Sequence, residues 1–235
     1  MWPRGWRAAS AGGGTERPLA GCAHMAKKAK KAAKSAVAAE KKAVQALEPI
    51  RDSALLDRLA DLGDQPQLRT VSVAMLAAGL AAGRRSEYGP RLARAGLRML
   101  LAHETATFAK NFVKNRIDRR RPRSNGAEEE DDVPTPGRSQ EKEDTSFPSG
   151  HSAGAAAATR AFAREFPEHG GAAAATGAAL ALVQIPRCAH YPTDVAAGLA
   201  IGLAAEAAVA ALWPASPHPA TAPEPAQEPL PCVTC

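Results

Sequence analysis

SGHSAGAAAATRAFARE, residues 149–165, is the stretch of sequence that decides the fold class. Alanine has the highest helix propensity of any residue, so this stretch predicts one continuous helix that ends before Pro167. Side chains this small also let neighbouring helices approach one another closely. The whole chain shares this character, because it is 45% hydrophobic but only 4% aromatic. We therefore expect a core of packed helices lined by small side chains.

The segments on either side of this helix are also helical in pattern. Apolar residues recur at helical spacing in residues 91–118, and an apolar run at 194–213 stops at Pro214. No segment shows the alternation that is typical of a strand. We therefore predict an all-α fold, an antiparallel bundle of about five to six helices that is embedded in a membrane or associated with one. The expected helices are residues 53–63, 70–83, 91–118, 149–165, 171–186 and 194–213.

The bundle is predicted to occupy residues 53–213, between two regions of different composition. Residues 1–52 form a basic extension rich in Lys and Ala, and residues 214–235 form a Pro-rich tail that we expect to be disordered. Residues 124–145 interrupt the bundle with a strongly polar, acidic stretch that is unable to bury a core. We interpret this stretch as a disordered loop.

The basic extension contains a helix of its own, residues 26–47, built from Ala, Lys and Glu. This helix either lies on anionic lipid or is a solvated, partly helical tail, and the sequence does not choose between the two. The composition changes abruptly at Met25, and the residues before it contain no apolar core of a signal peptide. We therefore expect translation to start at Met25, with residues 1–24 as an upstream over-extension.

Charged and histidine-containing clusters fall at the ends of three expected helices. Consecutive helices of an antiparallel bundle alternate in direction, so the end of one helix and the start of the next lie on the same side of the bundle. The end of 91–118, the start of 149–165 and the turn before 194–213 then share one side. The residues gathered there are Lys114, Arg121, Ser149, Gly150, His151, Arg187, His190 and Asp194.

This collection of side chains suits a phosphoryl group. Lysine and arginine neutralise phosphate oxygens, and a guanidinium offers them two donors in one plane. Backbone N–H groups at a helix start add further donors, and Gly150 lets the backbone approach a ligand closely. One imidazole can attack phosphorus while Asp194 orients it, and the second can protonate the leaving oxygen.

The net charge of +6 is compatible with phosphate, nucleic acid or an anionic membrane surface as a partner. The basic run at residues 119–121 is the feature that resembles a nucleic-acid patch. No aromatic residues interleave with this run, and no nucleic-acid-binding motif accompanies it. We therefore expect no nucleic acid among the partners, whereas the oligomeric state stays open.

In chain order, the same residues resemble the type-2 phosphatidic acid phosphatase superfamily, which also includes the vanadium haloperoxidases. Its first motif, K-x6-R-P, is matched by Lys114, Arg121 and Pro122. Its second, P-S-G-H, is matched by residues 148–151, and its third, S-R-x5-H-x3-D, is matched at His190 and Asp194. The resemblance spans residues 54–213 and leaves out the basic extension and the Pro-rich tail.

The resemblance implies a role for each matching residue. His190 would be the nucleophile that becomes phosphohistidine, Asp194 would orient it, and His151 would be the general acid. Phosphate would be held by Lys114, Arg121, Ser149 and Gly150. Neither a metal nor a cofactor is implied for a phosphatase of this family.

The third motif departs from the family pattern. Val183 and Gln184 stand where the family has Ser and Arg, so one phosphate-binding arginine is missing from its expected position. Arg187 lies three residues further on, close to the same face if the segment is helical. We expect Arg187 to replace the missing arginine.

Three functions follow from these residues and from the resemblance. The first is an acid phosphatase-type hydrolase of a phosphomonoester or pyrophosphate, acting on a lipid of the phosphatidic acid or isoprenoid pyrophosphate type in a bacterial inner membrane. The second is a vanadate-dependent haloperoxidase-like enzyme, which the shared pocket permits. The third is a non-catalytic membrane protein with a degenerate third motif.

Overall fold

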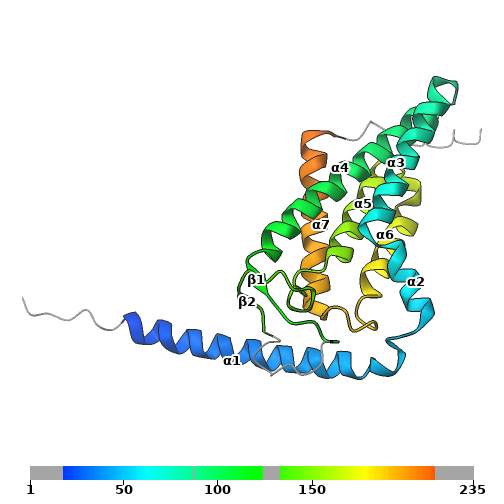
Figure 1. Ribbon diagram of the computed structural model, residues 1–235. Coiled ribbons are helices and arrows are strands. Elements are labelled where there is room, and N and C mark those ends of the chain that lie inside the picture. The colour runs from blue at the N-terminus through cyan, green and yellow to red at the C-terminus, as the bar shows by residue number, and fades with distance from the viewer. Residues whose placement is uncertain (1–17, 87, 124–132, 215–235) are drawn as a thin grey trace, which may run out of the picture.

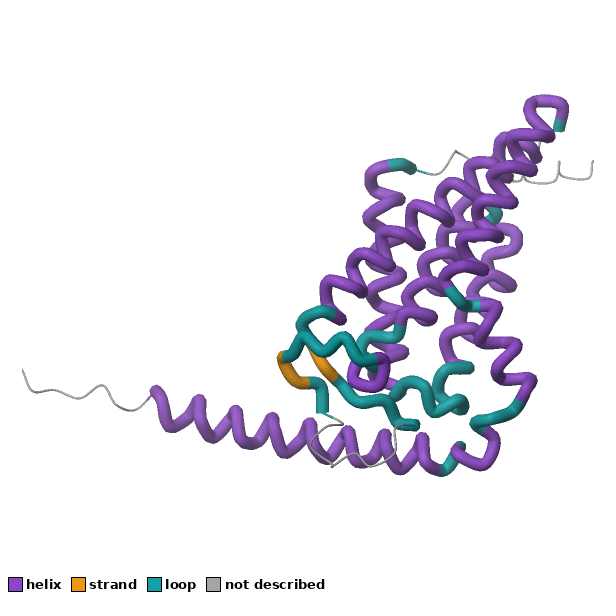
Figure 2. Tube along the Cα trace, in the orientation of Figure 1, coloured by secondary structure: helices purple, strands orange, loops and turns teal. Residues whose placement is uncertain are grey.

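The computed structural model describes residues 18–86, 88–123 and 133–214, and within these ranges the chain folds as a helical bundle (Figure 1). The predicted all-α class is confirmed. Helices α3 to α7 run alternately up and down, whereas α1 crosses the lower end of the bundle (Figures 1 and 2). The helices are α1 (Pro18–Gln45), α2 (Ala54–Leu62), α3 (Gln65–Ala82), α4 (Tyr88–Lys114), α5 (Gly150–Glu165), α6 (Gly170–Leu182) and α7 (Pro192–Leu212).

The start of α3 and the end of α6 differ from the prediction for reasons that involve proline. Helix α3 begins at Gln65 rather than Thr70, because Pro66 sits in its first turn, where the missing N–H costs nothing. Helix α6 ends at Leu182 rather than at residue 186, and a series of turns then leads to α7. The fixed φ and missing N–H of Pro186 oppose continuation of the helix through those turns.

A short two-stranded sheet was not predicted and corrects the expectation that the chain has no strands. Strand β1 (Ile117–Asp118) pairs antiparallel with β2 (Thr135–Pro136). Beyond them, the backbone N–H of Arg119 donates to the Asp144 carbonyl at 2.7 Å, and the N–H of Ser146 donates to the Arg119 carbonyl at 2.9 Å. Strand pairing therefore replaces the predicted last turn of the helix over 91–118.

Residues 133–145 belong to the stretch that was predicted to be a disordered loop, but they contain regular structure. Residues 133–145 form β2 and a 3₁₀ turn, Lys142–Asp144, whose backbone hydrogen bonds hold the segment that follows α4. Residues 124–132 lie outside the described residues, as do residues 215–235 of the predicted tail. Residues 143–146 are bonded to the segment that follows α4.

The core is built from small side chains, as its composition predicts. Ala102 and Ala106 of α4 pack with Ala153 and Ala157 of α5. Glycines bring two helix pairs still closer. A Cβ on Gly96 would lie 2.3 Å from the backbone nitrogen of Leu76 in α3. Backbone therefore packs directly on backbone where α3 meets α4.

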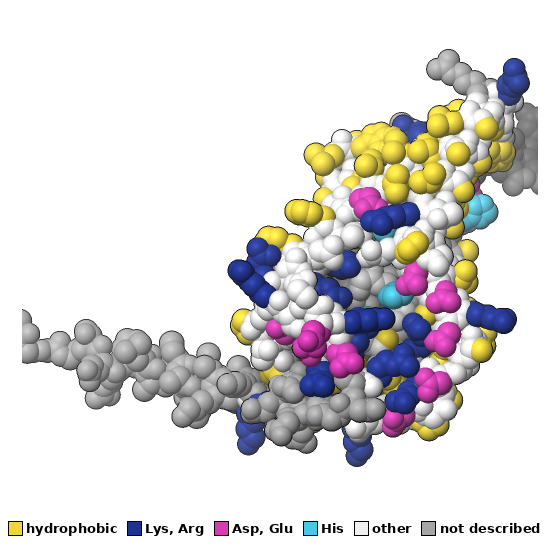
Figure 3. Space-filling model, viewed as in Figure 1, with side chains coloured by type: hydrophobic (Ala, Val, Ile, Leu, Met, Phe, Trp, Pro, Cys, Tyr) yellow, Lys and Arg dark blue, Asp and Glu magenta, His cyan; other side chains and the backbone are white. Residues whose placement is uncertain are grey.

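The two ends of the bundle differ in surface chemistry. Hydrophobic side chains gather over the upper end, whereas Lys, Arg, Asp and Glu surround the lower end, where α4 finishes and α5 and α7 begin (Figure 3). Helix α7, with a mean hydropathy of 2.0, is the one helix in the described ranges long and apolar enough to cross a bilayer. The charged end is where the predicted site residues lie.

The close approach of α3 and α4 makes Gly96 sensitive to the smallest substitution. We expect Gly96→Ala to destabilise the fold by about 1–3 kcal/mol, because the added methyl group meets backbone atoms that have no free rotation. Thermal unfolding in detergent measures this effect. Gly171→Ala is the matched control, since a Cβ there meets no atom within 4 Å. Equal melting temperatures for both variants would contradict the packing described above.

Candidate active site

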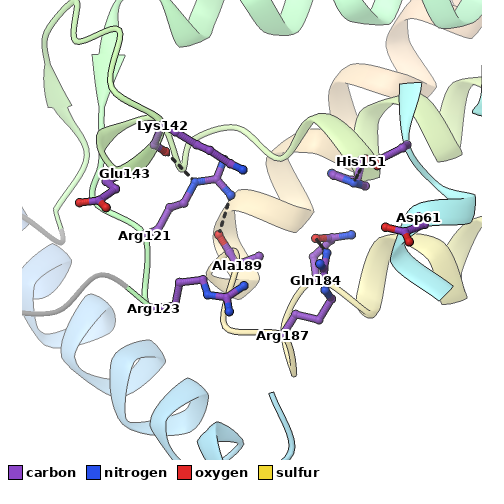
Figure 4. Close-up of a pocket in the computed structure, with 10 residues that line it drawn as sticks. Asp61, Arg121, Arg123, Lys142, Glu143, His151, Gln184, Arg187 and Ala189 are labelled. Atoms are coloured by element: carbon purple, nitrogen blue, oxygen red, sulfur yellow. Dashed lines mark hydrogen bonds and ion pairs between the residues drawn. The ribbon is translucent and has the colours of Figure 1, made fainter. Parts of the chain in front are cut away.

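A pocket of about 510 Å³ opens at the charged end of the bundle (Figure 4). The connection between α4 and α5 forms one wall, the start of α5 and the end of α2 form another, and the turn between α6 and α7 forms the floor. Four basic side chains, a histidine and three carboxylates line it. These residues are Arg121, Arg123, Lys142, Arg187 and His151, with Asp61, Asp64 and Glu143.

His190 lies in the turn before α7, and only 2% of it is exposed. Its Nδ1 atom lies 2.8 Å from the main-chain carbonyl oxygen of Ser146. A carbonyl only accepts hydrogen bonds, so Nδ1 carries the proton and the lone pair of the neutral ring is on Nε2. Burial lowers the pKa of His190 to about 4, which keeps the ring neutral near pH 7.

Asp194 lies in the first turn of α7 and is fully buried. The carboxylate accepts hydrogen bonds from Arg119 Nη1 and Ser146 Oγ, each at 2.5 Å, and from the backbone N–H of Tyr191 at 2.9 Å. Its Oδ2 atom is 3.8 Å from His190 Nδ1. Asp194 therefore holds Ser146, whose carbonyl contacts the imidazole, and supplies a negative charge beside the ring.

His151 is the second residue of α5 and points into the pocket (Figure 4). Its Nε2 atom forms an ion pair with the carboxylate of Asp64, the residue just before α3. Burial lowers the pKa of His151, and the negative charge of Asp64 opposes that effect. The pKa of His151 stays below its usual value, and Asp64 limits the loss of the protonated form that a general acid needs.

Arg121 of the first motif lines the pocket, and Lys114 lies close enough to Arg121 and Asp194 to interact with their charges. Lys114 ends α4, and burial lowers the pKa of its ammonium group to about 8. Arg121 is anchored by hydrogen bonds from Nε to the Lys142 carbonyl at 2.8 Å and from Nη1 to the Ala189 carbonyl at 3.4 Å. These bonds hold the guanidinium at the pocket wall (Figure 4).

Ser149 and Gly150 begin α5. The backbone N–H of Ser149 donates to the Asp194 carbonyl at 3.0 Å, so this group is already satisfied within the protein. The hydroxyl oxygen of Ser149 caps the helix by accepting from the N–H of Ser152. A Cβ on Gly150 would lie 3.3 Å from Lys110 Nζ, so the glycine makes room for a second lysine of α4.

Gln184 and Arg187 both line the pocket, on the turn that follows α6. Arg187 Nε donates to Asp57 at 2.9 Å, and Arg187 Nη1 lies 3.5 Å from the side-chain oxygen of Gln184. Gln184 is only 1% exposed, and its Nε2 has no hydrogen-bond partner among the described residues. The structure thus brings a guanidinium and an unpaired amide donor to the position of the missing arginine.

Several contributors to the site were not predicted from the sequence, among them Asp64, Lys110, Arg119 and Ser146. Lys110 had a signal, because it precedes Lys114 by one helical turn and so shares its face. Arg119 was hidden in a basic run, and Ser146 acts through its backbone. Among the residues described, no group of three or more His, Cys, Asp or Glu side chains is placed to hold a metal ion.

The chain is similar to known proteins in both sequence and fold. The model of the PAP2 superfamily matches residues 95–217 of the chain. The fold is similar to that of a transmembrane PAP2-type phosphatidylglycerolphosphate phosphatase from Bacillus subtilis, with a TM-score of 0.52 and 20% sequence identity over 76% of this chain and 86% of that chain. No curated protein matches the sequence.

The ionisation of His190 is open to direct measurement. We expect its ring to titrate near pH 4, because burial disfavours the cation. Since an unfolded histidine takes up its proton near pH 6.5, this group removes stability as the pH falls from 6.5 towards 4. NMR of histidine-labelled protein, assigned with His190→Gln, measures the midpoint. A midpoint at or above 6.5 would be inconsistent with the buried, neutral ring.

Proposed function

Because the chain belongs to the PAP2 superfamily, we propose that it is a lipid phosphatase in which His190 is the nucleophile. One observation carries the proposal. The hydrogen bond from His190 Nδ1 to the Ser146 carbonyl leaves the lone pair on Nε2, and burial keeps the ring unprotonated. A neutral imidazole with one ring nitrogen held in place is the form that attacks phosphorus.

In the first step, Nε2 of His190 forms a bond to phosphorus while the bond from phosphorus to the leaving oxygen breaks. The proton on His151 passes to that oxygen, so the leaving group departs as a neutral alcohol, or as a phosphate when the substrate is a pyrophosphate. The imidazole of His190 gains positive charge as the bond forms. Asp194, 3.8 Å from Nδ1, stabilises that charge.

In the second step, water attacks the phosphohistidine. His151, now neutral, accepts a proton from the water, and the bond from phosphorus to Nε2 breaks to release phosphate and restore His190. Lys114, Arg121 and Arg187 neutralise the phosphoryl oxygens in both steps, with Lys110 beside Gly150 as a further cation. Both steps need only side chains of this chain and water.

A lipid is the proposed substrate because the pocket sits at one end of a bundle whose other end is apolar (Figure 3). Helix α7 begins at the pocket and is long and apolar enough to span a bilayer. The similar Bacillus subtilis protein is transmembrane and dephosphorylates phosphatidylglycerolphosphate. We propose a phosphomonoester or pyrophosphate of the phosphatidic acid or isoprenoid type, cleaved at a bacterial inner membrane.

The nucleophile is tested by His190→Gln, which keeps a polar side chain in the buried turn. We expect phosphate release from phosphatidic acid and from an isoprenoid pyrophosphate, in detergent, to fall ~1,000-fold or more, because the attacking atom is lost. His169→Gln, a histidine in the turn before α6, is the control and retains activity. Full activity in His190→Gln would overturn the proposed mechanism.

The proposal that Arg187 takes the place of the arginine missing at position 184 can be tested separately. We expect Arg187→Ala to lower kcat/KM about 10- to 100-fold, since a charge-assisted hydrogen bond to phosphate contributes about 1.5–3 kcal/mol. Gln184→Ala removes a neutral donor and costs less. Arg116→Ala, whose guanidinium stacks on Phe112, is the control for loss of an arginine.

Steady-state kinetics on the same substrates separate these variants. Arg187→Ala with wild-type kinetics, together with inactive Gln184→Ala, would show that Gln184 rather than Arg187 fills the arginine's place.

A further inference from the structure

Helix α1 lies across the pocket end of the bundle, outside the residues that match the family (Figures 1 and 2). Three residues of its C-terminal half, Val37, Glu40 and Val44, are spaced three and four apart and so share one face. Val37 and Val44 are buried, and Val44 packs with Cys188 and Tyr191 beside His190. This face docks α1 on the turn that carries the nucleophile.

Glu40 is the polar member of that face, with 14% of its side chain exposed. One carboxylate oxygen accepts from the backbone N–H of Thr193 at 2.9 Å, and the other accepts from Thr193 Oγ1 at 2.9 Å. The second oxygen also accepts from Arg119 Nη2 at 3.0 Å. Glu40 therefore supplies a negative charge to the N-terminus of α7, where the helix dipole favours it.

Arg119 connects Glu40 to the catalytic turn. Its guanidinium is fully buried, lies over the ring of Tyr191 at 4.0 Å, and donates to Asp194 Oδ1 at 2.5 Å. Arg119 is thus held between two carboxylates. The charges of Glu40, Arg119 and Asp194 sum to −1 beside His190. Without Glu40, the positive charge of Arg119 would cancel the negative charge of Asp194.

We propose that Glu40 is a positioning residue for the reaction, acting through Arg119 on Asp194 and so on His190; this inference rests on the proposed function. Its charge leaves Asp194 with an uncancelled negative charge, which stabilises the imidazole when the bond to phosphorus makes the ring cationic. The C-terminal half of α1 therefore belongs to the catalytic unit, and the functional domain begins before residue 53. An interaction that strengthens only as charge develops lowers the barrier without tightening substrate binding.

The test compares Glu40→Gln with Val44→Ala in the full chain. Glu40→Gln removes the charge but keeps the shape, whereas Val44→Ala loosens the docking of α1 and leaves the charges intact. We expect Glu40→Gln to lower kcat about 10-fold with KM changed less than about 2-fold. Val44→Ala lowers the melting temperature, and at an equal loss of melting temperature its kcat falls less than that of Glu40→Gln. Glu48→Gln, an exposed glutamate paired with Arg51, is the control for loss of one negative charge.

Orthovanadate provides a readout that does not need turnover, because it bonds to a histidine nitrogen in the geometry of the attacked phosphorus. We expect isothermal titration to show orthovanadate binding weakened about 10-fold in Glu40→Gln, with orthophosphate binding unchanged. A wild-type protein that binds orthovanadate but hydrolyses no lipid phosphate would overturn the proposed function, and the effect of Glu40 on that binding would still be measured.

Two results would overturn the inference itself. One is wild-type kcat and wild-type orthovanadate affinity in Glu40→Gln. The other is a parallel loss of kcat and melting temperature in Glu40→Gln and Val44→Ala, which would make α1 a structural support. If Glu40→Gln does not fold, Glu40→Asp keeps the charge on a shorter side chain. Because that shorter side chain lengthens the contact with Arg119, Glu40→Asp supports the inference if kcat falls while KM stays at the wild-type value, and contradicts it if kcat is unchanged.

Discussion

The buried ion pair between Arg119 and Asp194 is the contact on which the site depends. It joins the segment that follows α4 to the first turn of α7, and the backbone of the same arginine is bonded to residues 144 and 146. Removing Arg119 would leave the charge of Asp194 unpaired in the interior, which costs several kcal/mol. Arg119 also donates to Thr193, and Asp194 accepts from Ser146. Because the carbonyl of Ser146 contacts His190, the buried ion pair helps to position the imidazole.

The helices that begin beside this ion pair approach each other closely. A Cβ on Gly198 of α7 would lie 2.4 Å from the carbonyl oxygen of Ser149, and one on Gly202 would lie 2.3 Å from the carbonyl of Ala153. Backbone contact between α5 and α7 therefore sets the separation of the two helices that begin at the pocket. An alanine-rich composition thus determines the geometry of the site as well as the fold class.

The helices, and the gathering of His151 and His190 at one end of the bundle, were predictable from helix propensity and residue spacing. Helix propensity and alternation of direction place His151 and His190 at one end of the bundle, and the motifs give their spacing. The sheet was missed because β1 and β2 have two residues each, too few to show a pattern. Glu40 was missed because its partners are distant in sequence, and nothing near Glu40 distinguishes it from other charges on a basic helix.

The pairing of β1 with β2 has a consequence for the segment between them. Its two ends are clamped together by the strands and by the bonds from Arg119 and Arg121 to residues 143–146. Because the cost of closing a loop rises only slowly with its length, residues added between these anchor points change the stability little and leave the catalytic elements where they are. A fusion point or a label therefore belongs between Arg123 and β2, because Arg119, Arg121 and Arg123 line or support the pocket.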